Sequence, residues 1–123
     1  MPQTPVSQYF DQLPAVIYPN RSAMGAAAAQ DARQIIQSAI TQRGVATVIL
    51  ATGNSQLTFL HVLRTFTDID WSKVVIFHMD EYVGIDPTHP ASFPLFLRQH
   101  IIDAIQPAAT MKHCCANKRS TWW

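Results

Sequence analysis

In this 123-residue chain, the position of two neighbouring carboxylates, Asp80 and Glu81, suggests a catalytic role. They directly follow an apolar run, residues 73–79, whose composition is typical of a buried β-strand. A carboxylate at the end of such a strand, in apolar surroundings, can act as a general base. Asp80 is the candidate base. Because neighbouring residues on extended backbone point in opposite directions, we expect only one of the two carboxylates to meet the substrate and the other to brace the loop. The alternative is that both only cap backbone N–H groups.

A second candidate site is the turn Thr52-Gly53-Asn54-Ser55, which follows another apolar run and opens a predicted helix. Glycine lets the backbone turn sharply, and the first N–H groups of a helix attract an anion. The hydroxyls of Thr52 and Ser55 and the amide of Asn54 can add donors. The turn is therefore a candidate phosphate site, although it matches neither the Walker sequence nor the dinucleotide fingerprint. The alternative is an ordinary turn in which Ser55 caps the helix.

The histidines and cysteines indicate neither a metal site nor a nucleophile. Their spacing fits no metal-ligand set, and the chain contains no Gly-x-Ser-x-Gly motif or Cys/His arrangement. We therefore expect no metal site. His78, inside the predicted strand, is expected to be a hydrogen-bonded core residue. His89 is assigned to a surface loop beyond the site, with contact to a ligand as the alternative. His61 and His100 are assigned to helices, as surface or interface residues.

The elements that must position these residues alternate between strands and helices, which predicts an α/β fold. The apolar patterns predict strands over 15–18, 45–51 and 73–79, and helices over 20–43, 56–66 and 92–105. Right-handed crossovers between them give a Rossmann-like, three-layer α/β/α arrangement with a mostly parallel sheet. Since the carboxyl ends of parallel strands meet at one edge, Asp80 and the turn 52–55 are expected to face one ligand.

Local signals fix the ends of these elements and the place of each strand. Asn20 or Ser22 is the expected N-cap of the first helix, Gly44 its end, and Ser92 the cap of the third. The run 45–51 is apolar almost throughout, which is typical of a central strand covered on both faces. The shorter run 15–18 is expected at an edge of the sheet.

Composition and charge exclude several classes of partner. The chain is 48% hydrophobic and 14% charged, with a formal net charge of +1, so neither nucleic acid nor an anionic membrane is an expected partner. No apolar run approaches the roughly 20 residues of a membrane span. The first residues lack the basic and apolar regions of a signal peptide, and cysteine is scarce, so we expect a cytoplasmic protein.

Three sequence blocks resemble a known family. Residues 51–55, 77–84 and 89–93, which read ATGNS, FHMDEYVG and HPASF, are similar to the glucosamine-6-phosphate deaminase/isomerase family. This family shares its fold with the 6-phosphogluconolactonases. The resemblance runs over about residues 15–105 and covers the N-terminal half of the family's sequence. The MDEYVG block followed by His-Pro-x-Ser is typical of the deaminases rather than the lactonases.

The resemblance implies an enzyme of amino-sugar catabolism that converts glucosamine 6-phosphate to fructose 6-phosphate and ammonia without a cofactor. On the matching positions, Asp80 would move a proton between C2 and C1 of the opened sugar, and the turn Thr52–Ser55 would hold the phosphate. A sugar phosphate is then the expected partner, and oligomers are possible in the full-length family. The alternatives are a 6-phosphogluconolactonase-like hydrolase and an inactive fragment that binds a sugar phosphate.

The resemblance also suggests how the chain is divided. We expect an N-terminal arm over 1–14, a partial sugar-phosphate domain over 15–109 and an unrelated tail over 110–123. The tail holds both cysteines and two of the three tryptophans, and its change in composition suggests a shifted reading frame. The family's second catalytic block is not found, so we expect a truncated domain that exposes apolar surface.

Overall fold

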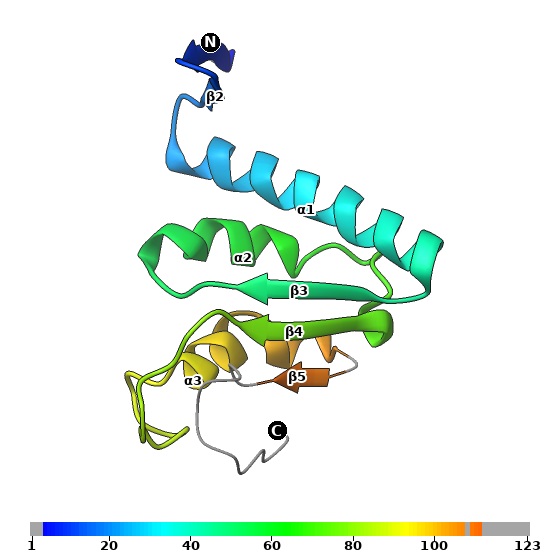
Figure 1. Ribbon diagram of the computed structural model, residues 1–123, viewed down its shortest axis with the longest axis vertical. Helices are drawn as coiled ribbons and strands as arrows, with labels where there is room; N and C mark the ends of the chain where they lie inside the picture. The colour runs from blue at the N-terminus through cyan, green and yellow to red at the C-terminus, as the bar shows by residue number, and fades with distance from the viewer. Residues whose placement is uncertain (1–3, 108, 112–123) are drawn as a thin grey trace.

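The structure, a computed structural model, describes residues 4–107 and 109–111. A short antiparallel hairpin precedes a three-stranded sheet and its helices (Figure 1). The elements in chain order are β1 (Val6–Phe10), β2 (Leu13–Ile17), α1 (Arg21–Arg43), β3 (Ala46–Leu50), the 3₁₀ segment η1 (Asn54–Gln56), α2 (Leu57–Leu63), the 3₁₀ segment η2 (Trp71–Lys73), β4 (Val74–His78), α3 (Phe93–Leu97), the π-helical segment η3 (Arg98–Ile102), α4 (Asp103–Ile105) and β5 (Ala109–Met111).

The strand expected over 15–18 does not join the main sheet, and that prediction was wrong. Its residues fall in β2, which pairs with β1 in a separate antiparallel hairpin, from Val6 opposite Ile17 to Phe10 opposite Leu13. Asp11 makes the turn with a positive φ of 55°, a conformation that aspartate tolerates better than most residues. The hairpin lies beyond the start of α1, at the top of Figure 1.

Helix α1 begins and ends as its sequence predicts. The Asn20 side chain accepts a hydrogen bond from the Ala23 N–H at 2.8 Å, and Gly44 ends the helix at φ 76°. The Gly44 N–H donates to the carbonyl of Ile40 at 2.8 Å, which satisfies one of the last free carbonyls. The Ala-rich sequence of α1 lets it lie close to α2, and at Gly25 there is no space for a side chain beside Thr58.

The main sheet has the order β3-β4-β5, and all its strands are parallel. Ala46 lies opposite Val74, and Leu50 lies opposite His78. In the part of the chain that the structure describes, β3 is therefore an edge strand and β4 is central, which corrects the expected central place of residues 45–51. The reason is that the apolar run identifies a strand but not its neighbours.

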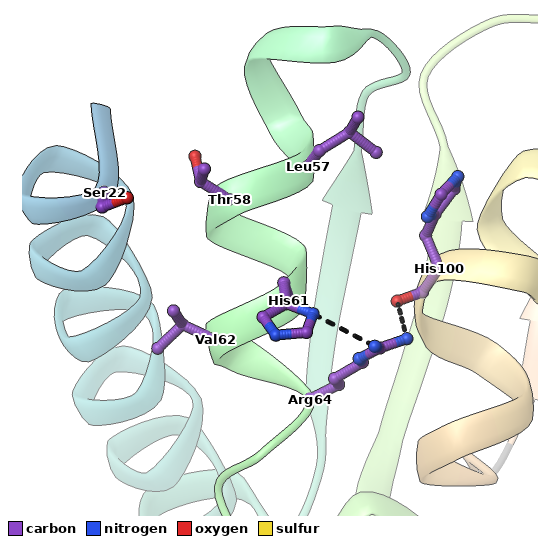
Figure 2. Close-up of a pocket in the computed structure, with 7 residues that line it drawn as sticks. All are labelled: Ser22, Leu57, Thr58, His61, Val62, Arg64 and His100. Atoms are coloured by element: carbon purple, nitrogen blue, oxygen red, sulfur yellow. Dashed lines mark hydrogen bonds between the residues drawn. The ribbon is translucent and has the colours of Figure 1, made fainter.

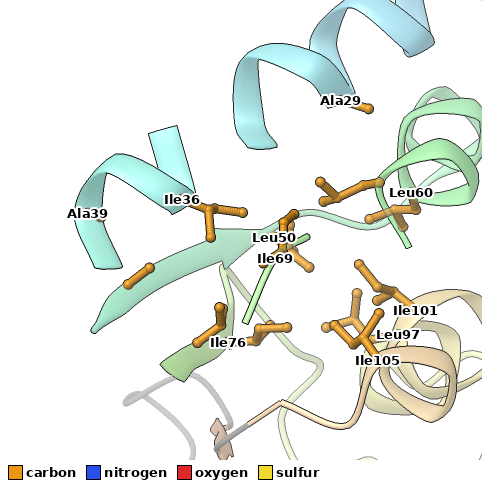
Figure 3. Packing of buried hydrophobic residues seen from close by; sticks show 13 residues of the cluster. Ala29, Ile36, Ala39, Leu50, Leu60, Ile69, Ile76, Leu97, Ile101 and Ile105 are labelled. Carbon is orange, nitrogen blue, oxygen red and sulfur yellow. The ribbon is translucent and has the colours of Figure 1, made fainter. Parts of the chain in front are cut away.

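Only one face of this sheet is covered by the described helices. Ala46, Leu50, Val74 and Ile76 point to that face and are buried, whereas Ile49 points the other way and is 69% exposed. The buried residues of the sheet form one core with residues of α1, α2, α3, η3 and α4 (Figure 3). The described residues thus form an α/β fold with one helical layer, not the three layers that we expected.

The third predicted helix, over 92–105, exists but changes its winding. It begins as α3 at Ser92, whose hydroxyl accepts from the Leu95 N–H at 3.5 Å, and it passes through η3 into α4. The chain then returns as β5, so Thr110 and Met111 of the predicted tail lie beside β4. The remainder of that tail, 112–123, lies outside the described residues. Of the helices described, none is long and apolar enough to cross a membrane.

Candidate functional site

The two predicted site segments meet at the carboxyl ends of β3 and β4. These strands are parallel neighbours, and their ladder continues one step further because the Met79 N–H donates to the carbonyl of Leu50 at 3.0 Å. Beyond that point, the hydroxyl of Thr52 forms a short hydrogen bond with Nε2 of His78. The expectation that the turn 52–55 and the segment around Asp80 share one edge is therefore confirmed.

Asp80 lies at this edge, but its surroundings differ from those expected. Its side chain is 66% exposed, so the described residues do not provide the apolar environment that the end of a buried strand suggested. The chain leaves the sheet after His78 and carries the carboxylate outward, away from the core. Its Oδ1 lies 3.4 Å from Nδ1 of His78, and its backbone carbonyl oxygen lies 2.6 Å from the same nitrogen.

Glu81 has the contacts of a supporting residue. One carboxylate oxygen accepts from the N–H of Tyr82 at 2.9 Å. The other accepts from the N–H of Phe93 at 3.2 Å and from the hydroxyl of Ser92 at 3.4 Å, so that Glu81 ties its loop to the start of α3. Ser92 is only 1% exposed, and its hydroxyl also caps α3. Asp80, by contrast, remains open to a ligand.

The turn that follows β3 is free of side-chain caps. Gly53 adopts φ 132° and ψ 166°, which strongly favours glycine, and its carbonyl accepts from the Gln56 N–H at 3.0 Å. No side chain caps η1 or α2, so the alternative in which Ser55 serves as a cap is wrong. Asn54 and Ser55 are exposed at the start of η1, where the first backbone N–H groups have no partner within the helix.

His78 is the residue whose importance the sequence did not show. It was expected to be a hydrogen-bonded core residue, and it is indeed 4% exposed and hydrogen-bonded. Its partners, however, are Thr52 and the backbone of Asp80, so it joins both halves of the site. Phe93 packs on its ring with a centroid distance of 4.8 Å. The alternation of buried residues in β4 could have predicted its burial but not its partners.

A cavity of about 390 Å³ lies apart from this edge, against α2 (Figure 2). Arg64 reaches across it and donates to Nδ1 of His61 at 3.1 Å and to the carbonyl of His100 at 3.3 Å. None of the predicted site residues lines it; its lining is Ser22, Leu57, Thr58, His61, Val62, Arg64 and His100. Across the described ranges, no group of three or more His, Cys, Asp or Glu side chains could hold a metal ion.

Comparison with known proteins decides the family. The model of the family of glucosamine-6-phosphate isomerases and 6-phosphogluconolactonases matches residues 19–121, which include both site segments. The chain belongs to this family.

Curated relatives of this family member are named glucosamine-6-phosphate deaminase. The relative from Arthrobacter sp. (strain FB24) is 34% identical over 101 residues, which are 80% of this chain and 37% of that protein. The relative from Thermoanaerobacter sp. (strain X514) is 31% identical over 77 residues, 60% of this chain and 30% of that protein. A second deaminase of Bacillus subtilis (strain 168) is 34% identical over 74 residues, 58% and 30% of the two chains. The chain thus spans about a third of these relatives.

Solved structures of the family share the fold. A 6-phosphogluconolactonase from Shewanella baltica OS155 superposes with a TM-score of 0.72 at 26% identity, over 85% of this chain and 43% of that one. A monomeric glucosamine-6-phosphate deaminase superposes with a TM-score of 0.69 over 80% of this chain and 42% of that one. Its 16% identity shows the fold alone. The α/β architecture of the described residues is therefore that of the family.

Proposed function

We propose that this chain carries the proton-transfer side of a glucosamine-6-phosphate deaminase site. The observation that supports this most is the juxtaposition of the exposed carboxylate of Asp80 with the uncapped turn 52–55, at adjacent strand ends. This arrangement occurs in a chain whose curated relatives are named as deaminases of this sugar phosphate. A place that binds the phosphate and a group that accepts a proton are the two features that such a substrate requires of its site.

In the proposed reaction, Asp80 takes a proton from C2 of the opened sugar and returns it to C1, while a second proton passes from the amino group on C2 to the oxygen on C1. The C2 imine that results is hydrolysed by water, which releases ammonia and leaves fructose 6-phosphate. Proton transfer of this kind needs a well-placed carboxylate and no metal or organic cofactor. The phosphate would lie at the start of η1, against the backbone N–H groups of Asn54 and Ser55, because a helix start favours an anion. Glu81 would hold the loop in place.

We further propose that the complete domain has the three layers of a Rossmann-like fold. The described helices cover one face of the sheet, while Ile49 on the opposite face is 69% exposed. The solved relatives are more than twice as long as the part that superposes. A helix from further sequence would bury that face, and it would enclose Asp80 in the less polar surroundings that a general base needs. We also propose that residues 110–123 are unrelated to this domain, although Thr110 and Met111 lie beside β4.

The direct test is ammonia release from glucosamine 6-phosphate by the purified 123-residue chain. Because the chain spans about a third of its relatives, we expect slow release that Asp80→Asn decreases by about 10²- to 10⁴-fold, the usual contribution of a general base. Asp31→Asn is the matched control, since it neutralises an exposed carboxylate of α1 and leaves the loop of Asp80 unchanged. Equal rates for the wild-type protein and Asp80→Asn would rule out the assigned role of Asp80.

A second candidate function is hydrolysis of 6-phosphogluconolactone. It is favoured by the superposition on the Shewanella lactonase, which has the higher identity of the two solved structures compared. Both substrates carry a phosphate, so the turn 52–55 would bind either. Assaying the same preparation on both substrates distinguishes the two reactions. Binding of fructose 6-phosphate in calorimetry, with no turnover of either substrate, would instead identify a sugar-phosphate-binding fragment.

A further inference from the structure

His78 lies between the two halves of the site and contacts both. Its ring is 4% exposed, with Nε2 bonded to the hydroxyl of Thr52 and Nδ1 placed 2.6 Å from the carbonyl oxygen of Asp80. Phe93, at the start of α3, packs on the ring, and Tyr82 packs on Phe93 at a centroid distance of 5.1 Å. A polar ring that is buried and held from two sides in this way has little freedom to turn.

The contacts of His78 fix the place of its proton. A carbonyl oxygen can only accept, so Nδ1 must carry the hydrogen that it donates to Asp80 at 2.6 Å. In a neutral ring, Nε2 then has a free lone pair and accepts the hydrogen of the Thr52 hydroxyl. The longer contact of 3.2 Å from the Asp80 N–H to Nδ1 is not a hydrogen bond in this tautomer, because that nitrogen has no lone pair left in the ring plane.

We propose that His78 is a positioning residue that couples the turn at Thr52 to Asp80 through this one tautomer. The chain of donors runs from the Thr52 hydroxyl to Nε2 and from Nδ1–H to the carbonyl of Asp80. It fixes the backbone from which the Asp80 carboxylate projects, at a set distance from the phosphate-binding turn. The importance of this coupling for catalysis rests on the proposed function, whereas the coupling itself does not.

The coupling also assigns a different role to Thr52 from the one that the sequence suggested. A hydroxyl has one hydrogen, and here His78 accepts it, so Thr52 cannot donate to a phosphate at the same time. The donors that remain for an anion belong to Asn54 and Ser55, which are exposed. Thr52 therefore holds the site together, and its two neighbours in the turn bind the ligand.

The tautomer can be measured directly on the unmodified chain. Long-range ¹H–¹⁵N spectra of histidine side chains distinguish a protonated ring nitrogen from an unprotonated one by its chemical shift. At neutral pH, we expect His78 to show a protonated Nδ1 and an unprotonated Nε2. His61 is the internal reference with the opposite pattern, because its Nδ1 accepts from Arg64 (Figure 2). A protonated Nε2 on His78, or averaged signals from both nitrogens, would overturn the proposal.

A pair of substitutions tests whether the coupling reaches Asp80. Thr52→Val keeps the shape of the side chain and removes its hydroxyl, while Thr52→Ser keeps the hydroxyl. We expect Thr52→Val to shift the backbone amide resonance of Asp80 and to mix the two tautomers of His78. Thr52→Ser should leave both near their wild-type values. An Asp80 amide that does not move in Thr52→Val would show that no coupling exists.

Activity measurements separate this proposal from the proposed function. If the wild-type chain releases no ammonia but His78 has the expected tautomer and Thr52→Val shifts Asp80, then the function fails and the coupling stands. If the chain releases ammonia, the positioning role predicts that Thr52→Val decreases kcat about tenfold with little change in KM, and that Thr52→Ser restores it. An unchanged kcat in Thr52→Val would overturn the positioning role, although the reaction itself would stand.

Discussion

The loop after β4 is held by hydrogen bonds between individual side chains and backbone groups. Ser92 is the most deeply buried of these side chains, and its hydroxyl serves two partners. It accepts from the N–H of Leu95 at 3.5 Å and donates to Glu81 at 3.4 Å. One hydroxyl therefore caps α3 and anchors the acidic loop, because the cap of a helix and the end of the loop coincide at this residue.

Removing the hydroxyl of Ser92 should lower the free energy of unfolding. We expect Ser92→Ala to cost about 1 kcal/mol, the usual value of a lost N-cap, because the Leu95 N–H then has no partner. Urea unfolding followed by circular dichroism measures the change. Ser72→Ala, at an exposed serine that caps no helix, is the control and should change stability by no more than about 0.5 kcal/mol. Equal stability of both variants would show that the cap contributes nothing.

Helices α1 and α2 lie in close contact, and one glycine permits it. A Cβ atom at Gly25 would lie 2.7 Å from Oγ1 of Thr58 and 3.1 Å from the backbone nitrogen of Phe59. Real Cβ atoms essentially never show a contact of 2.7 Å, and the contact of 3.1 Å, to a backbone atom, is tighter than nine in ten real ones. The hydroxyl of Thr58 is buried at this contact, and it has no hydrogen-bond partner among the described residues.

Replacing this glycine should separate the two helices. In an exposed helix, Gly→Ala stabilises by about 1 kcal/mol, but at Gly25 we expect destabilisation by about 1–3 kcal/mol because the new methyl group overlaps Thr58. The midpoint of urea unfolding measures it. Ala28→Gly, at an exposed position of the same helix, gives the intrinsic helix preference for comparison. If Gly25→Ala raised the midpoint, the two helices would not be as close as described.

A second link joins α1 to the connection between α2 and β4. The guanidinium of Arg33 donates to both carboxylate oxygens of Asp68, at 2.9 Å from Nε to each, and Gln37 donates to the same carboxylate at 2.9 Å. The hydrogen bond from Arg33 is the main cause that holds the pKa of Asp68 below its ordinary value, and the one from Gln37 adds to it. The same contact raises the pKa of Arg33.

This link predicts a loss of stability in acid. A carboxyl group whose pKa is lowered by folding stabilises the folded chain above its ordinary pKa of about 4, and the contribution disappears as the pH falls through the lowered value. We therefore expect Asp68→Asn to melt below the wild-type protein at pH 7, and the difference to vanish in acid. Melting temperatures between pH 2 and 7 test this, with the exposed Asp31→Asn as control. A difference that persisted unchanged in acid would contradict it.

Among the described residues, large apolar side chains are exposed in several places, and two of these places are surfaces of strands. The hairpin has six large apolar side chains at least 49% exposed, namely Val6, Tyr9, Phe10, Leu13, Val16 and Ile17. An isolated two-stranded hairpin is marginally stable in water. The second place is the open face of the main sheet, where Ile49 is exposed. Surfaces of this kind on a soluble chain usually mark a contact with other protein.

The purified chain should therefore associate with itself or with a complementary chain. In sedimentation velocity, we expect species larger than a monomer, whose fraction increases with concentration. Ile49→Thr, which keeps a β-branched side chain and removes apolar surface, should shift the distribution toward the monomer. Val75→Thr, at a less exposed position of the neighbouring strand, is the control. A monomer with a cooperative melt at all concentrations would contradict this expectation.

Much of the fold could be predicted from the sequence because its signals are local. The cap at Asn20, the end at Gly44 and the start at Ser92 each depend on a few neighbouring residues, and all three were confirmed. The place of a strand in a sheet depends on distant residues, so the pairing of β2 with β1 and the edge position of β3 could not be read from either strand alone. The partners of His78 were missed for the same reason, since Thr52 is 26 residues away.

The register between β3 and β4 has a consequence for how this site can change in evolution. The pairing that places Val74 opposite Ala46 in the core also places His78 opposite Leu50, two residues before Thr52. Side chains alternate between the two faces of a strand. A deletion of one residue within β4 would therefore turn the ring of His78 out of the core, and it would also expose the apolar side chains that share its face of the strand. Selection for a folded chain alone is therefore sufficient to preserve the spacing between the two halves of the site. The same spacing would persist in descendants that had lost the reaction.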